Sequence, residues 1–328
     1  MKAVLESPRW RLPQVIDRAE KNTVVPASEP RRHHYVPQFY LRRLACADDP
    51  NKVMVVERHR DILASDRKSI DRIGWEEGLH NYVENGIAGS VEGELNKTIE
   101  TPFSDSPTWA KIESGDFAAL TKADGLSIYG FARHLQRRNV ATLRFMQQEH
   151  ERFLSDAPTD HTEEEREMHR WVAGTPGGAH RLFREGALDT SLPDDAHAIN
   201  VMICQAPIPF RSSTNPTLMV SQPGRESVFG QMFNSLRTWW LTLDRHWGAF
   251  IVAGGPPGFS STSVDPRVAR VINQRYLVQL LHGDARYMLA DDPYLEPDLK
   301  WAGFAFEQST TRGFRFRADT WKDPPDRT

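Results

Sequence analysis

Cysteine is scarce in this chain, with only Cys46 and Cys204 among 328 residues. Two cysteines so far apart do not suggest a disulfide framework, and they cannot complete a four-ligand structural zinc site on their own. Long apolar runs are missing too. None approaches the ~18 residues of a membrane-spanning helix, and the start MKAVLESPRWRLPQ has no apolar signal-peptide core. These absences predict a cytoplasmic protein with no membrane partner.

An excess of positive charge is also absent. The chain has 41 Lys and Arg against 44 Asp and Glu, which gives a formal net charge of -3 at pH 7. No overall attraction to nucleic acid or to a membrane surface follows, so any basic site must be a local patch. The 39% of hydrophobic residues is ordinary for a globular protein, and the length is enough to bury a sizeable core.

Several catalytic signatures are missing. The sequence contains no G-x-x-x-x-G-K-[ST] phosphate loop, no G-x-G-x-x-G fingerprint, no H-E-x-x-H and no G-x-S-x-G. The Gly-rich stretch GGPPG (254–258) carries two prolines, which lack the N–H donors that a phosphate cradle needs. The sequence therefore gives no support to the enzyme classes that these signatures mark.

The residue pattern changes along the chain. Helical spacing dominates to about residue 195, with expected helices over 87–100, 116–154 and 162–172 and a short strand over 52–56. After about residue 196, short apolar runs alternate with turn residues, as in a sheet. A further helix is expected over 265–283, because Asp265 can cap it, Pro266 suits its first turn and Gly283 can end it.

This order predicts an α+β fold, in which a helical N-terminal two-thirds packs on a mixed or antiparallel sheet built mainly from the C-terminal part. Residues 1–30 have little periodicity and are expected to form a loose leader. Residues 31–307 are expected to form a single α+β domain. Residues 308–328 are expected to form a polar tail.

The most distinctive stretch is RRHHYVPQFYLRR, residues 31–43. Pro37 suits the first turn of a helix, so His33 and His34 are expected just before that helix. The N–H groups of a helix start, two histidines and arginines such as Arg42 and Arg43 can bind a phosphate or a carboxylate. In the structural alternative, the histidines pack against the helix start and the arginines face solvent.

A metal-dependent nuclease of the H-N-H type is a sharper hypothesis for the same stretch. Such a site needs a histidine base, an asparagine that orients it and a later histidine that binds the metal. His34, Asn51 and His59 have nearly the required spacing. Against this hypothesis, the usual Gly-Gly turn is missing, and the segment between Asn51 and His59 reads as a strand.

Two further segments carry candidate polar groups. Glu92 and Glu100 share a helix face with Asn96, but two helical turns separate the carboxylates by ~12 Å at the backbone, so a shared metal would need another segment. A solvated face is the favoured interpretation. His134 and Arg137 lie on the long helix, where an arginine more often pairs with a carboxylate than takes part in catalysis.

The turn PFRSSTNP (209–216) places Ser213, Thr214 and Asn215 after a strand. Short polar side chains of this kind usually bond to their own backbone in a turn, which is the favoured interpretation. The alternative is a loop that directs these groups into a pocket.

The block HHYVPQFYLRRL resembles the H-Y-V-P-Q-F-Y-L-R-x-F block of a mainly microbial family of unknown function. The likeness continues to about Ala290 through four looser blocks: VEGELNKTIE, YGFARHLQRRNVATLR, PFRSSTNP and VARVINQRYLVQLLHGDARYMLA. Thr214 stands where that family has Asp, and Asn139 lies near the place of its Thr-Pro. The resemblance implies a common organisation but no established activity, and it weakens the H-N-H hypothesis.

The sequence thus predicts a site that combines polar groups from three distant segments. The expected catalytic residues are His33, His34, Gln38, Arg42, Arg137 and Asn215, and the expected substrate-binding residues are Arg43, Ser213, Thr214 and Glu92. We expect an enzyme acting on a phosphate-containing or otherwise anionic substrate, with a nucleic-acid phosphodiester as one candidate. A histidine would be the general base and Arg42 or Arg137 would stabilise negative charge.

A non-catalytic protein that binds an anion or a partner is the alternative. A third interpretation is purely structural, with the His-Arg block locking the start of the chain onto the core. A divalent metal cofactor, the reaction type and the oligomeric state are left open by the sequence.

Overall fold

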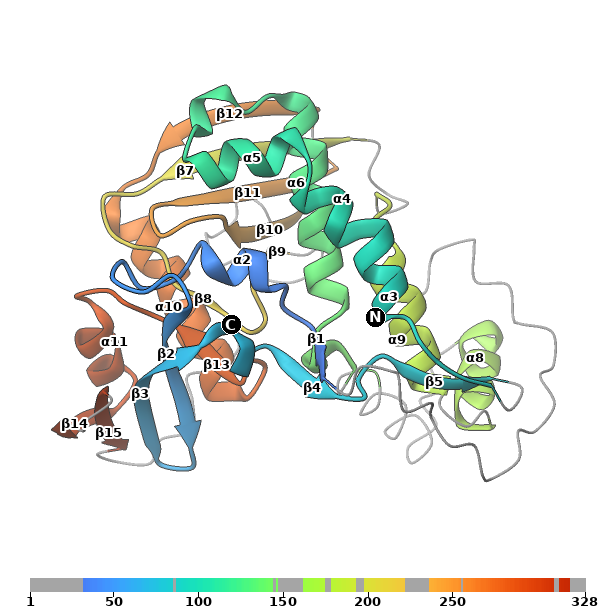
Figure 1. The fold of residues 1–328 in the computed structure, drawn as a ribbon, viewed down its shortest axis with the longest axis horizontal. Helices are drawn as coiled ribbons and strands as arrows, with labels where there is room; N and C mark the ends of the chain where they lie inside the picture. The colour runs from blue at the N-terminus through green and yellow to red at the C-terminus, as the bar shows by residue number, and fades with distance from the viewer. Residues whose placement is uncertain are drawn as a thin grey trace.

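A computed structural model describes residues 32–84, 87–143, 146, 162–174, 178–192, 198–221, 236–254, 256–309 and 313–318 (Figure 1). Its helices are α2 (Gln38–Arg42), α3 (Glu92–Leu95), a π-helical turn (Asn96–Glu100), α4 (Thr101–Ser104), α5 (Pro107–Ser114), α6 (Lys122–Arg137), α8 (Glu163–Gly174), α9 (Gly178–Leu188), α10 (Pro266–His282) and α11 (Leu295–Trp301). Short 3-10 turns lie at Ile70–Arg72 and Phe117–Ala119.

Two large sheets and two small hairpin-like pairs account for the described strands. The five-stranded sheet has the order β12-β7-β11-β10-β9, the six-stranded sheet has the order β14-β15-β3-β2-β13-β8, and β1 pairs with β4 and β5 with β6. The strands are β1 (Arg32–His34), β2 (Lys52–His59), β3 (Ile62–Ser69), β4 (Trp75–Glu77), β5 (Asn81–Glu84), β6 (Ile87–Ser90), β7 (Ile199–Gln205), β8 (Ser212–Ser213), β9 (Thr217–Ser221), β10 (Arg237–Thr242), β11 (Trp247–Ala253), β12 (Gly258–Ser263), β13 (Tyr287–Leu289), β14 (Phe304–Ser309) and β15 (Gly313–Ala318).

The five-stranded sheet is buried on both faces. Side chains of a strand alternate between faces, and the adjacent residues Trp239 and Trp240 of β10 accordingly belong to two different hydrophobic cores. Trp239 shares its core with Phe131 of α6, whereas Trp240 shares its core with Tyr276 of α10. The sheet therefore lies between these two helices, with β12 added parallel to β7 at one edge.

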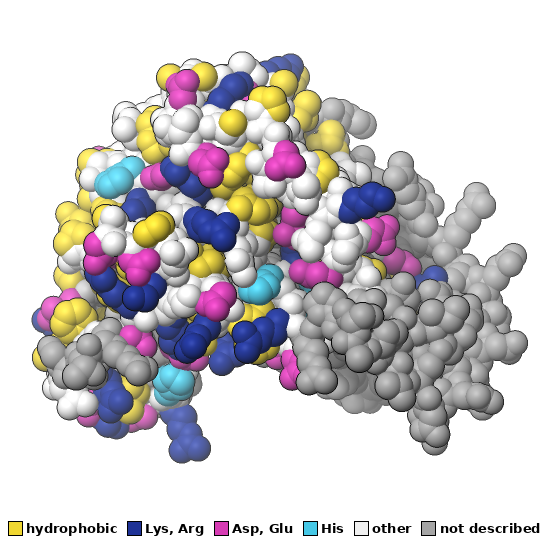
Figure 2. Space-filling view, viewed as in Figure 1, with side chains coloured by type: hydrophobic (Ala, Val, Ile, Leu, Met, Phe, Trp, Pro, Cys, Tyr) yellow, Lys and Arg dark blue, Asp and Glu magenta, His cyan; other side chains and the backbone are white. Residues whose placement is uncertain are grey.

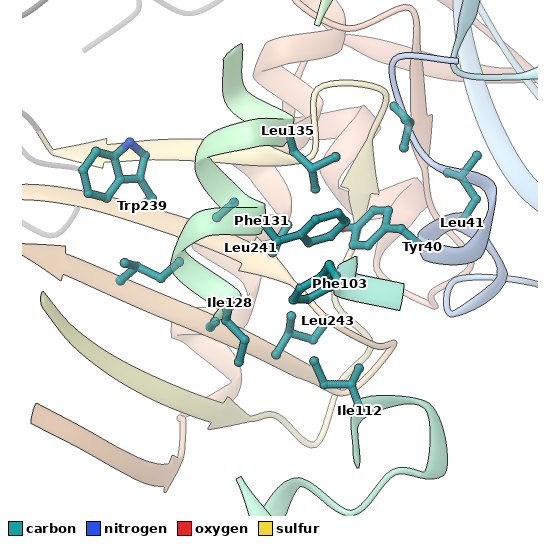
Figure 3. Close-up of a cluster of buried hydrophobic side chains, with 14 of the residues drawn as sticks. Tyr40, Leu41, Phe103, Ile112, Ile128, Phe131, Leu135, Trp239, Leu241 and Leu243 are labelled. Carbon is teal, nitrogen blue, oxygen red and sulfur yellow. The ribbon is translucent and has the colours of Figure 1, made fainter. Parts of the chain in front are cut away.

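The first core explains the aromatic residues of the opening stretch. Figure 3 shows the Tyr40 ring of α2 directed toward Phe131 on α6, and Leu41 belongs to the same core. The Phe131 ring stacks on Phe103 with a centroid distance of 4.1 Å. The Tyr40 hydroxyl is buried and donates to the Thr242 carbonyl at 2.7 Å. This block therefore anchors the start of the described chain to the core.

The α+β fold class is confirmed, and the helix ends near residues 265 and 283 were predicted well. The Asp265 carboxylate accepts from the Arg267 amide, and Gly283 ends α10 with a left-handed φ of 77°. The strand expected over 52–56 is β2, and the turn before it leads into a hairpin that joins the six-stranded sheet.

Three boundaries differ from the expectations. The segment 87–100 begins as strand β6, and its helix starts only at Glu92. The long helix expected over 116–154 ends at Arg137. Strand β15 lies at 313–318, where the sequence suggested only a polar tail. The leader 1–30 lies outside the described residues.

Both cysteines are buried free thiols. Within the described ranges, no helix combines the length and apolar character needed to cross a membrane.

Candidate functional site

An open pocket of about 540 Å³ lies where the first segment of the chain meets the C-terminal end of α10. This volume is within the usual range for small-molecule sites, about 300–1,000 Å³. Four of its residues, Tyr35, Val140, Thr214 and Arg286, come from four of the five blocks that carry the family resemblance. The other lining residues are Glu57, Arg58, Arg60, Glu76, Ala141, Leu280, Leu281, His282, Gly283, Asp284 and Ala285.

Thr214 connects the turn after β8 to the strand β13. Its hydroxyl oxygen accepts from the backbone amides of Arg286 at 3.0 Å and Tyr287 at 3.1 Å, and its own amide donates to the Tyr287 carbonyl at 2.9 Å. A hydrogen bond also joins the hydroxyls of Thr214 and Tyr35. The Thr214 hydroxyl also donates to the Tyr287 carbonyl at 3.4 Å. Thr214 therefore ties the Tyr35 hydroxyl to the strand β13.

Tyr35 stays a neutral phenol at physiological pH. Burial raises its pKa to about 12, because the phenolate would lose hydration, and the Glu76 carboxylate acts in the same direction. The Arg286 guanidinium acts in the opposite direction. The Tyr35 hydroxyl therefore lies in the fields of a carboxylate and a guanidinium that line the same pocket.

The Lys and Arg side chains around the pocket differ in how closely other groups bind them. Lys68 donates to Glu57 at 2.5 Å and lies 4.4 Å from the Tyr287 ring centroid. Arg58 donates to the carbonyl of Leu281 at the end of α10. Arg286 is held loosely, since its Nε lies 3.6 Å from Glu57, its guanidinium lies 5.2 Å from the Tyr287 ring centroid and its side chain is 58% exposed. Figure 2 shows Lys and Arg side chains gathered over the region of β2, β3 and β13.

A buried polar cluster lies at the C-terminal end of α6. His34 and Arg138, which a hydrogen bond joins there, are one and two positions before the pocket residues Tyr35 and Val140. Arg138 is fully buried and makes ion pairs with Glu100 and, at 3.4 Å, with Glu92. Its guanidinium also donates to the backbone carbonyl of His34. The solvated face favoured for Glu92 and Glu100 is wrong, because both side chains are buried and pair with Arg138. The wider π-helical turn Asn96–Glu100 carries the second carboxylate.

Three buried histidines complete this cluster. The His134 Nδ1 lies 2.9 Å from the Ala187 carbonyl, and its Nε2 lies 3.3 Å from Glu100. The His33 Nδ1 accepts from the His80 backbone amide at 2.8 Å, and the two rings stack at 5.5 Å. His80 in turn lies 3.4 Å from Glu92. We call the six residues His33, His80, Glu92, Glu100, His134 and Arg138 the Arg138 cluster.

Burial disfavours charge throughout the Arg138 cluster. It lowers the pKa of Arg138 to about 10 and that of His134 to about 4, and it raises the pKa of Glu92. The His34 pKa is lowered by burial first and by the nearby Arg138 charge second. At neutral pH the imidazoles of His34 and His134 are therefore uncharged.

The histidines and arginines of residues 32–43, the described part of the opening stretch, do not line the pocket. His33 is fully buried in the Arg138 cluster, and the half-buried His34 ring lies 3.2 Å from the Gln38 amide. Arg42 is exposed, whereas Arg43 is paired with Asp244. Among the described residues of this stretch, Tyr35 alone lines the pocket.

Of the other predicted residues, some lie in the Arg138 cluster and some in the pocket. Arg137 pairs with Asp189 rather than with the histidines, and the adjacent Arg138 takes the inward position. Glu92 lies in the Arg138 cluster and Thr214 in the pocket.

The remaining turn residues stabilise local structure. Ser213 bonds to the Asn215 carbonyl at 2.8 Å and to the Gln279 amide oxygen at 2.9 Å. Asn215 accepts from the Asn139 side chain at 3.2 Å, which ties the turn to the end of α6. The turn interpretation therefore holds for Ser213 and Asn215, while Thr214 also has access to the pocket.

The H-N-H hypothesis does not fit the structure. Asn51 and His59 lie at opposite ends of strand β2, which is eight residues long. Eight strand residues span about 26 Å, far beyond the reach of one shared metal. Among the described residues, no group of three or more His, Cys, Asp or Glu side chains can hold a metal ion.

We expect the Arg138 cluster to depend on its single guanidinium. Arg138→Met leaves two buried carboxylates and the His34 carbonyl without their partner, and removal of one member of a buried ion pair costs about 3–5 kcal/mol. The midpoint of urea unfolding should fall sharply. Arg137→Met is the matched control, because its half-exposed pair with Asp189 should contribute less than about 1 kcal/mol. Equal effects of the two changes would contradict this role of Arg138.

The buried His134 should make stability depend on pH. Its folded-state pKa of about 4 lies below the ordinary 6.5, so the unfolded chain binds this proton first as the pH falls. The contribution is fully present above pH 6.5 and is lost toward pH 4, by roughly 3 kcal/mol. Glu92, whose pKa is raised, acts with the opposite sign above pH 4.5.

His134→Asn separates these two contributions, since its amide can still reach the Ala187 carbonyl. The difference in unfolding free energy between the wild type and this variant should shrink between pH 6.5 and 4. His59→Asn, which removes an exposed histidine, should leave the pH dependence as in the wild type. A constant difference between the wild type and His134→Asn would show that His134 takes up no proton on unfolding.

Comparison with known proteins gives a family but no activity. No curated protein and no solved structure matches the chain. A family model described as a protein of unknown function, DUF4238, matches residues 32–233. This match spans more than half of the 328 residues and includes Tyr35, Thr214 and the Arg138 cluster. The chain therefore belongs to the DUF4238 family.

Proposed function

We propose that this chain binds a small anionic ligand, bearing a phosphate or a carboxylate, in the pocket formed by Tyr35, Thr214 and Arg286. One observation carries the proposal: an exposed guanidinium and a neutral phenol line the same pocket. A guanidinium binds such oxyanions through paired hydrogen bonds, and the phenol adds a further donor.

The neighbouring charges are compatible with this binding. Glu57 is paired with Lys68, and Arg58 donates to a terminal carbonyl of α10, where the helix dipole would otherwise repel an anion. The Glu57 carboxylate and this end of α10 are therefore both compensated. Arg286 lies 3.6 Å from Glu57 and 5.2 Å from the Tyr287 ring centroid, and its 58% exposed side chain can turn toward a ligand.

The Arg138 cluster suits a supporting role better than direct binding. Its guanidinium already faces two carboxylates, so no positive charge is left over for an anion. Tyr35 follows His34 directly, and Val140 comes two residues after Arg138. The bond from Arg138 to the His34 carbonyl therefore joins two parts of the pocket wall.

Binding can be tested with inorganic phosphate by isothermal titration calorimetry at low ionic strength. Arg286→Ala should weaken binding at least about tenfold, since a hydrogen bond to a charged group contributes roughly 1.5–3 kcal/mol. Arg267→Ala is the matched control, because this arginine is 90% exposed at the opposite end of α10. The proposal fails if the wild type shows no saturable binding, or if Arg286→Ala binds phosphate as the wild type does.

An enzyme acting on a phosphate ester is the second candidate, with a nucleic-acid phosphodiester as one substrate. The observation that favours it is the same phenol and guanidinium, which could stabilise charge on a phosphoryl oxygen during hydrolysis. In this candidate Tyr35 replaces His33, His34, Arg42 and Arg137 as the group nearest the substrate. A cytoplasmic location is part of both candidates.

The second candidate predicts turnover of bis(p-nitrophenyl) phosphate by the wild-type protein, followed as nitrophenolate release. Tyr35→Phe should then lower kcat by roughly a hundredfold, the effect of removing one stabilising donor. Phosphate affinity should change much less. Absence of release by the wild type would contradict this candidate for such diesters and leave the binding protein.

A further inference from the structure

The pocket also contains a carboxylate that the proposed anion site does not use. Glu76 lies on β4, is half-buried and lines the pocket together with Tyr35 and Arg286. Within the part of the chain that the structure describes, no hydrogen bond or ion pair joins its carboxylate to another side chain. Its negative charge raises the pKa of the Tyr35 hydroxyl, and both residues line the same pocket.

The backbone gives Glu76 this position. Strand β4 pairs with β1 in an antiparallel register that sets Glu76 opposite His33 and Trp75 opposite His34. His33 is fixed in the Arg138 cluster, so the strand that carries Glu76 is fixed as well. The neighbouring Glu77 is exposed and does not line the pocket, because successive side chains of a strand point to opposite sides.

A simple anion is therefore a poor match to the whole pocket. Its charge would be favoured by Arg286 and opposed by Glu76, since both act in one partly enclosed volume. A simple cation would meet the reverse problem at Arg286. A ligand with an anionic group and an ammonium group satisfies both side chains at once.

We infer that the natural ligand is a small zwitterion, whose phosphate or carboxylate binds Arg286 and Tyr35 and whose ammonium group binds Glu76. This inference rests on the proposed anion-binding function and adds the second charge. The three contacts come from β4, the β1–α2 connection and the residue before β13.

Two probes with the same phosphate group test the inference. Phosphoethanolamine carries an ammonium group two carbons from its phosphate, whereas ethyl phosphate ends in a methyl group. The wild-type protein should bind phosphoethanolamine at least about tenfold more tightly, measured by calorimetry at one pH and low ionic strength. Equal affinity for the two probes would overturn the zwitterion inference while leaving the anion site intact.

Variants test whether Glu76 is the residue that binds the ammonium group. Glu76→Gln should remove the preference for phosphoethanolamine by at least about tenfold and should leave ethyl phosphate binding equal or slightly tighter. Glu77→Gln, one residue along the same strand, should keep the preference. Arg286→Ala should weaken both probes together.

The two proposals fail in different ways. Absence of binding of either probe to the wild type would overturn the anion site and the zwitterion inference together. A preference that survives Glu76→Gln would overturn only the role of Glu76. The wild-type comparison needs no variant, so it holds even if one of the substitutions unfolds the protein.

Discussion

The burial of one guanidinium, Arg138, is the constraint on which the rest of the site depends. A fully buried arginine is tolerated only where its charge and its donors have partners. Here the partners come from three separate segments: Glu92 and Glu100 from the α3 region, the His34 carbonyl from β1, and His134 from α6 itself. These segments can approach only in the arrangement that surrounds this charge.

This constraint extends to the pocket through the chain itself. His34 is followed directly by Tyr35, and its strand β1 sets the register of β4, which carries Glu76. On the other side, Asn139 follows Arg138 and bonds to Asn215, one residue from Thr214. Tyr35, Thr214 and Glu76 are thus each one or two residues, or one strand pairing, from a buried polar group.

Much of the fold could be predicted because local signals agreed with it. Asp265, Pro266 and Gly283 delimit α10, and the helical spacing of the opening block predicted α2. The early end of α6 also had a signal that was not used. Asn139 bonds to the carbonyls of Leu135 and Gln136 and accepts from the Thr142 amide, so one asparagine ends one helical segment and begins the next.

The site was harder to predict because it depends on which face each side chain takes. Arg138 continues the buried stripe of Ile128, Phe131 and Leu135, three residues beyond the last of them, whereas Arg137 does not. The spacing of these residues in the sequence therefore favours Arg138, rather than Arg137, as the buried arginine. Arg286 and Glu76 had no comparable signal, since Glu76 lies on a short strand and Arg286 directly before one, and the strands beside them come from distant parts of the chain.

The hydroxyl of Thr214 shows how one residue type affects the charge of the pocket. The two backbone amides that it accepts from would be satisfied equally by a carboxylate, which the family likeness places at this position. A carboxylate there would add a negative charge beside Tyr35 and Arg286, within a space that already holds Glu76. Arg286 would then face two acidic groups and would have less positive potential for a ligand. The threonine keeps the structural bonds without that charge, so Arg286 keeps more positive potential for the anionic group of a ligand.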